Sequence, residues 1–319
     1  MTAWPDWSCP AHHTPLTRTG DALRCANGET YPIRESIPRF VESQAYTAGF
    51  GSQWQHFRLT QLDSKTGTTI TEDRLRRCLG EELWTSLAGK HVLECGCGAG
   101  RFTEILVREG AYVTSVDMSE AVVVNHENVR SERHRVAQAD LMKLPFAPRQ
   151  FDVVMCLGVL QHTPDTRVAL QRLYDHVRPG GWLVVDHYRR TWKRFTTLAP
   201  LFRAWMKRLS PKAALRWNER IVKFFFPLHV RARGRVSKLL LGRITPVMYY
   251  GDVYTDLTPE QHYQWSLLDT HDSLTDWYKR LLTKPEFQRM LEELGGTGVW
   301  CEHGGNGIEG RIRRPEERG

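Results

Sequence analysis

The sequence lacks any apolar run approaching the roughly 18–20 residues that a membrane-spanning helix needs. Its first six residues contain neither a basic segment nor an apolar core, so we expect no secretory signal there. The seven cysteines are odd in number and irregularly spaced, and they form no recognisable disulfide framework. Reduced thiols without a leader are typical of cytoplasmic proteins, and the cytoplasm is the location we expect.

Acidic residues are nearly missing from one stretch of the chain. Residues 189–243 contain 16 Lys or Arg and one acidic residue, Glu219, which gives this stretch a charge near +15. The whole chain has a net charge of +8, so the remaining residues carry about −7. Positive charge gathered in one segment is a clue to the kind of partner that the protein meets.

Changes in composition and periodicity divide the chain into five parts. The first has the short runs and turns of a small β module, and the second is mainly helical. The third alternates strands with helices, the fourth is a basic and aromatic-rich insertion, and the fifth completes the third. Their bounds are residues 1–42, 43–90, 91–188, 189–265 and 266–319.

The alternating part predicts the fold class. Strands that alternate with helices along the chain form a parallel sheet with right-handed crossovers. A helix over residues 285–294 and a hairpin over residues 299–311 follow the insertion. We therefore expect an α/β protein with a doubly wound, mostly parallel Rossmann-like sheet. The additions are a C-terminal antiparallel hairpin, a helical lid insertion and the small N-terminal β module.

A glycine-rich turn follows the first strand of the alternating part. Its glycines are Gly96, Gly98 and Gly100, and Glu94 stands two residues before the first. Glycine is needed where the backbone turns sharply and a ligand lies against it. The G-x-G-x-x-G spacing of nucleotide-binding dehydrogenases would require another glycine where this chain has Arg101.

The pattern instead resembles the first motif, [DE]-x-G-x-G-x-G, of the class I methyltransferases that depend on S-adenosylmethionine (SAM), and in particular methyltransferase type 11. The resemblance continues in order over about residues 90–190, through four further segments. It implies SAM as the cofactor and methyl transfer as the reaction, with the helical second part covering the cofactor. The matching segments are residues 113–119, 139–146, 151–154 and 178–181.

The resemblance also implies roles for single residues. The Asp117 carboxylate can accept hydrogen bonds from both ribose hydroxyls. Met118 can lie on the adenine ring, and Asp140 can accept from the adenine amine. Glu94 and the Leu157 carbonyl serve the methionine ammonium. The full set expected at the cofactor is Glu94, Gly96, Gly98, Gly100, Arg101, Asp117, Met118, Asp140, Leu141 and Leu157.

Methyl transfer to a weakly acidic hydroxyl also needs a base that takes the proton. His162, after the fourth strand, is the first candidate because histidine titrates near neutrality; the alternative is a structural residue that binds the loop backbone. His187, after the fifth strand, is the second candidate. His271 and Asp272 belong to an acidic cluster that either assists His162 and orients substrate or simply caps a C-terminal helix.

Three accounts fit the basic insertion. Its charge is merely solvated, or it attracts an anionic acceptor or a membrane surface, or it binds nucleic acid, which we favour less. If it attracts the acceptor, Arg203, Lys207 and Arg208 are expected to contribute.

The N-terminal module resembles the Trm112-like zinc ribbon, with the pattern C-P-x-C followed by L-x-C-x-x-C. Cys9 and Cys25 match, His12 or His13 takes the second ligand position, and Gly28 takes the fourth. A structural zinc ion wants four ligands. Because three remain, we expect the module to be metal-free and the protein to have no metal site.

The sequence therefore favours a SAM-dependent methyltransferase acting on an oxygen or nitrogen of a small-molecule acceptor, either anionic or lipid-linked. Peripheral contact with a membrane is compatible with this interpretation. One alternative is an rRNA or tRNA methyltransferase that uses the basic segment as its footprint. Another is a non-catalytic SAM-binding protein whose module and lid recruit a partner. The pattern leaves the acceptor atom and the oligomeric state open.

Overall fold

The computed structural model describes residues 4–41, 53–191 and 196–317. Residues 42–52 lie outside the described residues, and with them the beginning of the segment expected to be helical. Residues 192–195 of the basic insertion also lie outside them.

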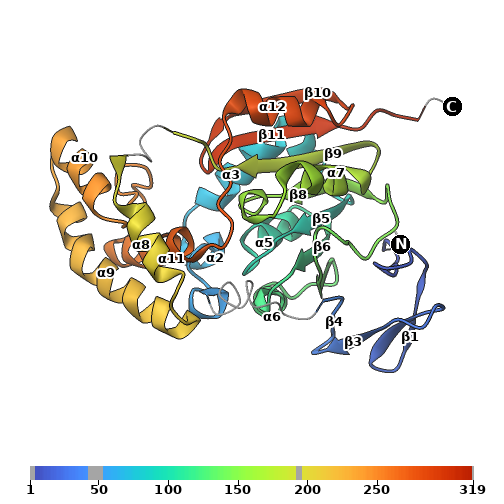
Figure 1. Cartoon of the computed structure of the whole chain (residues 1–319). Coiled ribbons are helices and arrows are strands. Elements are labelled where there is room, and N and C mark those ends of the chain that lie inside the picture. Colours follow the sequence, from blue (N-terminus) through green and yellow to red (C-terminus); the bar gives the residue numbers. More distant parts are fainter. Residues whose placement is uncertain (1–3, 42–52, 192–195, 318–319) are drawn as a thin grey trace.

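The core is a seven-stranded sheet in the order β10-β11-β9-β8-β5-β6-β7 (Figure 1). Neighbouring strands from β9 to β7 in this order run parallel, and the hairpin of β10 and β11 joins β9 in the antiparallel direction. The expected fold class is confirmed. The strands are β5 (His91–Cys95), β6 (Tyr112–Asp117), β7 (His134–Gln138), β8 (Phe151–Cys156), β9 (Val177–His187), β10 (Thr297–Gly304) and β11 (Gly307–Arg313).

Helices cover both faces of this sheet. Successive strand residues point to opposite faces, so Val92 packs in one apolar cluster with α3, α4 and α5, whereas Leu93 packs in another with α7 and α12. The sheet is therefore doubly wound. The covering helices are α3 (Ile70–Leu79), α4 (Glu81–Trp84), α5 (Arg101–Arg108), α6 (Ala121–Asn128), α7 (Thr166–Asp175) and α12 (Lys284–Glu292), and the short helices are α2 (Asp63–Thr66) and η1 (Leu160–His162).

The N-terminal module is a four-stranded antiparallel sheet that lies against the β7 edge of the core (Figure 1). The Phe40 amide donates to the Gln138 carbonyl at 2.8 Å, and the Trp7 ring stacks on Phe146 at 5.0 Å between centroids. Backbone pairing and ring packing thus join the module to the sheet. Its strands are β1 (Leu16–Thr19), β2 (Ala22–Cys25), β3 (Thr30–Arg34) and β4 (Ile37–Pro38).

A group of helices, here called the helical layer, lies beside the carboxyl ends of the parallel strands (Figure 1). It has an apolar cluster of its own, in which Ile221 and Val222 pack with Leu267 and Leu268. The expected boundary at residue 265 falls inside α11, so this helix joins the insertion to the C-terminal part. Among the described residues no helix has the length and apolar character to span a membrane. The layer consists of α8 (Ala199–Met206), α9 (Pro211–Arg231), α10 (Arg235–Ile244) and α11 (Pro259–Thr275).

Candidate functional site

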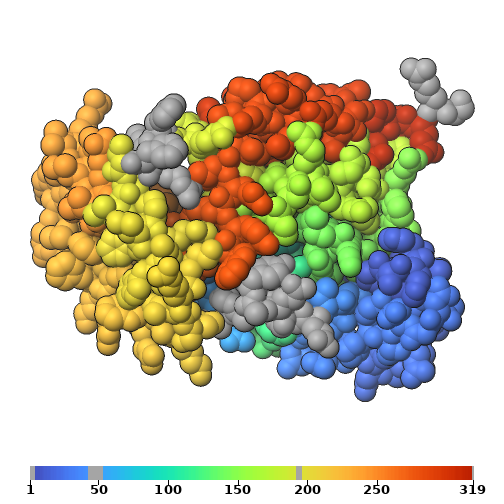
Figure 2. All heavy atoms as spheres, in the orientation of Figure 1, coloured from blue at the N-terminus to red at the C-terminus, as the bar shows by residue number. Residues whose placement is uncertain are grey.

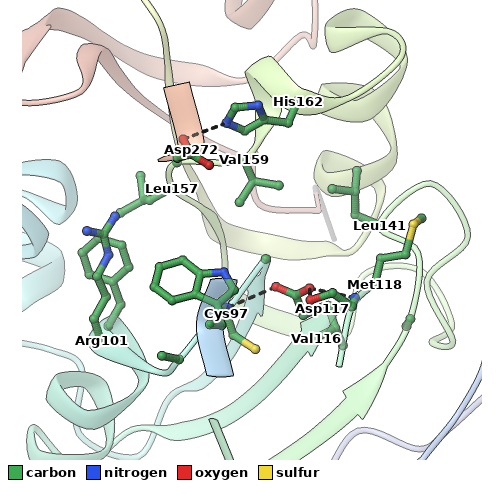
Figure 3. Close-up of a pocket in the computed structure, with 18 of the residues that line it drawn as sticks. Cys97, Arg101, Val116, Asp117, Met118, Leu141, Leu157, Val159, His162 and Asp272 are labelled. Atoms are coloured by element: carbon green, nitrogen blue, oxygen red, sulfur yellow. Dashed lines mark hydrogen bonds and ion pairs between the residues drawn. The ribbon is translucent and has the colours of Figure 1, made fainter. Parts of the chain in front are cut away.

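A pocket opens at the carboxyl ends of β5, β6 and β8 (Figure 3). The glycine turn and Asp117 line it from the sheet, and Asp272 lines it from α11. His162 of η1 lines it as well. The carboxyl ends of parallel strands are where α/β proteins bind their ligands.

The glycine turn allows no side chain at two positions. Gly96 has φ of 78°, and a Cβ there would lie 2.2 Å from the Val159 side chain. Gly98 has φ of 51°, and a Cβ there would lie 2.9 Å from the Trp54 ring. Both conformations are accessible mainly to glycine. The bare backbone therefore forms a cradle that a flat or bulky ligand can approach closely.

Asp117 is held in place at the end of β6. One carboxylate oxygen accepts from the Ser119 amide at 2.9 Å and its hydroxyl at 2.7 Å, and the other accepts from the Gly98 amide at 3.1 Å. Burial raises the pKa of Asp117, and these hydrogen bonds lower it. Since a carboxylate has about four acceptor sites, lone pairs remain for a diol in the pocket.

Asp140 lies at another wall of the pocket with Met118 and Leu141 (Figure 3 labels the latter two). Its carboxylate accepts from the Met142 amide at 2.8 Å, and burial raises its pKa. Two apolar side chains beside one acceptor suit a flat heterocycle that carries an amino group.

Glu94 lies behind the glycine turn and is not among the pocket-lining residues. One of its oxygens accepts from the Thr103 hydroxyl at 2.6 Å and the Ser115 hydroxyl at 3.2 Å. The other is buried without a partner among the described residues. Burial raises the pKa of Glu94 to about 7. The unpaired oxygen can accept one more hydrogen bond.

Arg101 is the first residue of α5 and lines the pocket. Its guanidinium lies over the Phe102 ring at 4.6 Å and donates to the Gln61 side chain at 2.6 Å. Burial lowers its pKa to about 10, so it remains charged at neutral pH. Gln61 and Trp54 also line the pocket, and the sequence analysis named neither of them as a site residue.

His162 lies at the centre of a polar cluster. Its Nε2 is 3.9 Å from Asp272 (dashed in Figure 3), and its Nδ1 is 3.6 Å from Asp276 and 3.1 Å from the Tyr278 carbonyl oxygen. The Tyr188 hydroxyl donates to Asp272 at 3.1 Å. An Nδ1–H that donates to Tyr278 makes Nε2 the acceptor nitrogen of the ring. Such an arrangement suits a base.

The other two histidine candidates lie outside the pocket lining. His187 is fully buried, with Nδ1 donating to the Tyr188 carbonyl at 3.0 Å and Nε2 3.2 Å from the Thr166 hydroxyl. His271 is also buried, its Nδ1 lies 2.9 Å from the Gln53 side chain, and burial lowers its pKa to about 4. Of the four expected catalytic residues, the structure brings His162 and Asp272 together in the pocket.

The N-terminal module brings Cys9, His12 and Cys25 together, with their ligand atoms within 4.8 Å of one another. A hydrogen bond with the Thr14 hydroxyl lowers the pKa of Cys25 to about 7, which favours its thiolate. The geometry therefore selects His12 over His13 as the third member. Gly28 offers no side chain for a fourth, and the absence of a metal ion stays a prediction.

Known proteins resemble the chain in sequence and in fold. Residues 93–185 match the family described as "Methyltransferase domain". The chain is 33% identical over 186 residues to the ubiquinone biosynthesis O-methyltransferase of Pseudomonas entomophila, covering 57% of this chain and 75% of that protein. It is 32% identical over 163 residues to the same-named protein of Marinobacter nauticus, covering 49% and 68%. A solved structure of a putative SAM-dependent methyltransferase from Methanococcus maripaludis is 13% identical, has a TM-score of 0.47, and is covered over 98% of its length by 87% of this chain.

Proposed function

The chain belongs to the SAM-dependent methyltransferases, with SAM as its cofactor, and on this basis we propose that it methylates an oxygen atom of a small-molecule acceptor. The observation that carries the proposal is the position of His162 and Asp272 in the pocket that also contains the glycine turn and Asp117. The names of the relatives favour oxygen over nitrogen as the acceptor atom.

The residues of the pocket fit the cofactor. Asp117 would hold the ribose hydroxyls, and Asp140, with Met118 and Leu141 beside it, would hold the adenine. Arg101 would pair with the cofactor carboxylate, and the Leu157 carbonyl would accept from its ammonium group. When bound, SAM supplies an activated methyl group on a sulfonium. The chain's own contribution is to place the acceptor and remove its proton.

On the acceptor side, His162 would take the proton of the hydroxyl at Nε2, and bound SAM would supply the methyl carbon and keep the electron pair of the broken C–S bond on its sulfur. The imidazolium that results has Asp272 beside Nε2 and Asp276 beside Nδ1, at 3.9 and 3.6 Å. Opposite charges at this distance stabilise the protonated ring. Tyr188 acts as a positioning residue, because its hydroxyl holds Asp272.

The proposed function also includes an anionic acceptor, its attachment to a lipid and a cytoplasmic location for the protein. The positive charge of the insertion supports an anionic acceptor. If the acceptor is anionic, rising salt should weaken its binding but not the binding of SAM. A lipid-linked acceptor is supported by the exposed apolar surface of the helical layer. The cytoplasmic location is supported by the cysteines of the described residues, all of which are unpaired.

The test is transfer of labelled methyl from SAM to phenolic small molecules by the purified chain. His162→Ala is expected to lower turnover by roughly 10²–10⁴-fold, the usual contribution of a general base, with SAM affinity unchanged. His303→Ala, at an exposed histidine of β10, is the matched control and should retain full activity. Full turnover of His162→Ala at saturating acceptor would place the base elsewhere.

A further inference from the structure

Helix α10 exposes an apolar face to solvent. None of its residues, Arg235–Ile244, is buried. Val236, Leu239, Leu240 and Ile244 are exposed by 71%, 46%, 54% and 51%. Their spacing of i, i+3, i+4 and i+8 places them on one side of the helix. In a protein surrounded only by water, such a stripe is expected to face the core.

The second half of α9, which precedes α10 in the chain, also exposes apolar side chains. Phe224, Leu228 and Val230 are exposed by 70%, 44% and 52%, whereas Ile221 and Val222 are buried in the cluster of the helical layer. The described residues contain 16 exposed large apolar side chains, and seven of them lie within residues 220–244. Apolar side chains that gather in this way mark an interaction surface.

The same residues carry only positive charge. Residues 220–244 contain seven Lys or Arg and no Asp or Glu, and all seven basic side chains are exposed. Within the described part of the chain, Lys238 pairs with Asp252, and the other six form no ion pair with a carboxylate. The basic residues are Arg220, Lys223, Arg231, Arg233, Arg235, Lys238 and Arg243.

Helices α9 and α10 form the outer edge of the helical layer, on the side away from the sheet (Figure 1). In the space-filling view this edge projects, and none of the other described residues covers its outline (Figure 2). An extended surface can therefore approach the two helices directly.

We propose that α9 and α10 dock on the surface of a membrane that contains anionic phospholipids. The apolar side chains enter the boundary between head groups and acyl chains, and the basic side chains meet the lipid phosphates. Nucleic acid would satisfy the charges but would leave the aliphatic face of α10 without an apolar partner. The proposal goes beyond methyl transfer and does not depend on it.

The experiment measures binding of the full chain, without acceptor, to vesicles of phosphatidylcholine with and without phosphatidylglycerol. We expect binding to the anionic vesicles that salt reduces only in part. Arg233→Gln/Arg235→Gln should bind at least about tenfold more weakly at low salt, given roughly 1 kcal/mol for each basic residue near the surface. Val236→Ser/Leu240→Ser should lose the part of the binding that resists salt.

Matched controls lie elsewhere on the surface. Val168→Ser removes an exposed apolar side chain from α7, and Arg24→Gln removes an exposed charge from the N-terminal module. Both should bind vesicles as the unmodified chain does. Because α10 buries no residue and Arg233 before it is exposed, both double variants should keep the circular dichroism and melting temperature of the parent.

Three results would overturn the proposal. The first is equal binding to neutral and anionic vesicles, or to neither. The second is RNA binding, tighter than vesicle binding, that the arginine variant loses and the apolar variant keeps. The third is a dimer in light scattering that Val236→Ser/Leu240→Ser dissociates, which would assign the surface to a second copy of the chain.

Discussion

The Arg203 guanidinium on α8 donates from Nε to the Asp276 carboxylate at 2.6 Å. It also donates to the backbone carbonyl of Asp276, and Lys207 donates to that of Trp277 at 3.1 Å. Two of the three basic residues that we expected to attract the acceptor therefore bind the chain itself. Since Asp276 also lies beside His162, this ion pair joins the helical layer to the pocket.

Removing the guanidinium should loosen the helical layer. Arg203→Met leaves the fully buried Asp276 with Lys279, 3.3 Å away, as its one remaining Lys or Arg partner in the described structure. We expect the free energy of unfolding to fall by roughly 3 kcal/mol, the scale for breaking a buried ion pair. Urea denaturation measures it. Arg208→Met, at an exposed residue without an ion pair in the described structure, should change it by no more than about 0.5 kcal/mol.

Asp117 should contribute to cofactor affinity. Asp117→Ala removes the proposed ribose acceptor and is expected to weaken SAM binding by about 1–3 kcal/mol in calorimetry. Asp165→Ala is the control, since Asp165 caps α7 and does not line the pocket. It should cost stability and leave SAM affinity intact. Equal affinity of Asp117→Ala and the parent would contradict the assignment.

Glu94 should make stability depend on pH. Its pKa in the folded chain is about 7, against 4.5 for the free side chain. Between these values the folded state keeps a proton that the unfolded state has lost, so this contribution to stability falls as pH rises from about 4.5 to about 7. The total reaches about 3 kcal/mol. Glutamine does not titrate, so the free energy of unfolding of Glu94→Gln relative to that of the parent should rise from low pH to pH 8.

Denaturation of both proteins across this pH range, without SAM, isolates the effect because other titrating groups cancel in the difference. Glu132→Gln, at an exposed glutamate, should show a difference that does not vary with pH. If the difference between Glu94→Gln and the parent does not vary with pH, folding does not raise the pKa of Glu94.

The N-terminal module should contain less than one zinc ion per chain. Cys9, His12 and Cys25 are close enough to share an ion, but a structural site needs a fourth ligand, and the ribbon's fourth position is Gly28. Elemental analysis of protein purified without chelator measures the ratio. If the parent contains one zinc ion per chain and Cys25→Ser contains none, the three side chains bind zinc together with a further donor. That result would contradict the prediction.

The sequence predicted the parts of the structure that depend on local spacing. The glycine turn and Asp117 lie close together because neighbouring parallel strands end at the same edge of the sheet. By contrast, Arg203 and Asp276 are 73 residues apart, and no local pattern pairs them.

The sequence also could not show which side chains are buried. His162 follows β8, whereas His187, expected after its strand, is the last residue of β9, and only packing places the first in the pocket lining and the second outside it. The spacing in α10 would be the same if its apolar stripe faced the core, so the sequence could not show that the stripe faces outward.

The separate apolar cluster of the helical layer affects how the protein can diverge. Its side chains pack mainly against one another and against Phe57, whereas the sheet is filled by other clusters. Substitutions in α9 and α10 should then accumulate with little cost to the sheet that binds the cofactor. Over evolutionary time, the surface that the protein meets can change by substitution in α9 and α10, while Asp272 of α11 and the pocket that binds SAM are inherited unchanged.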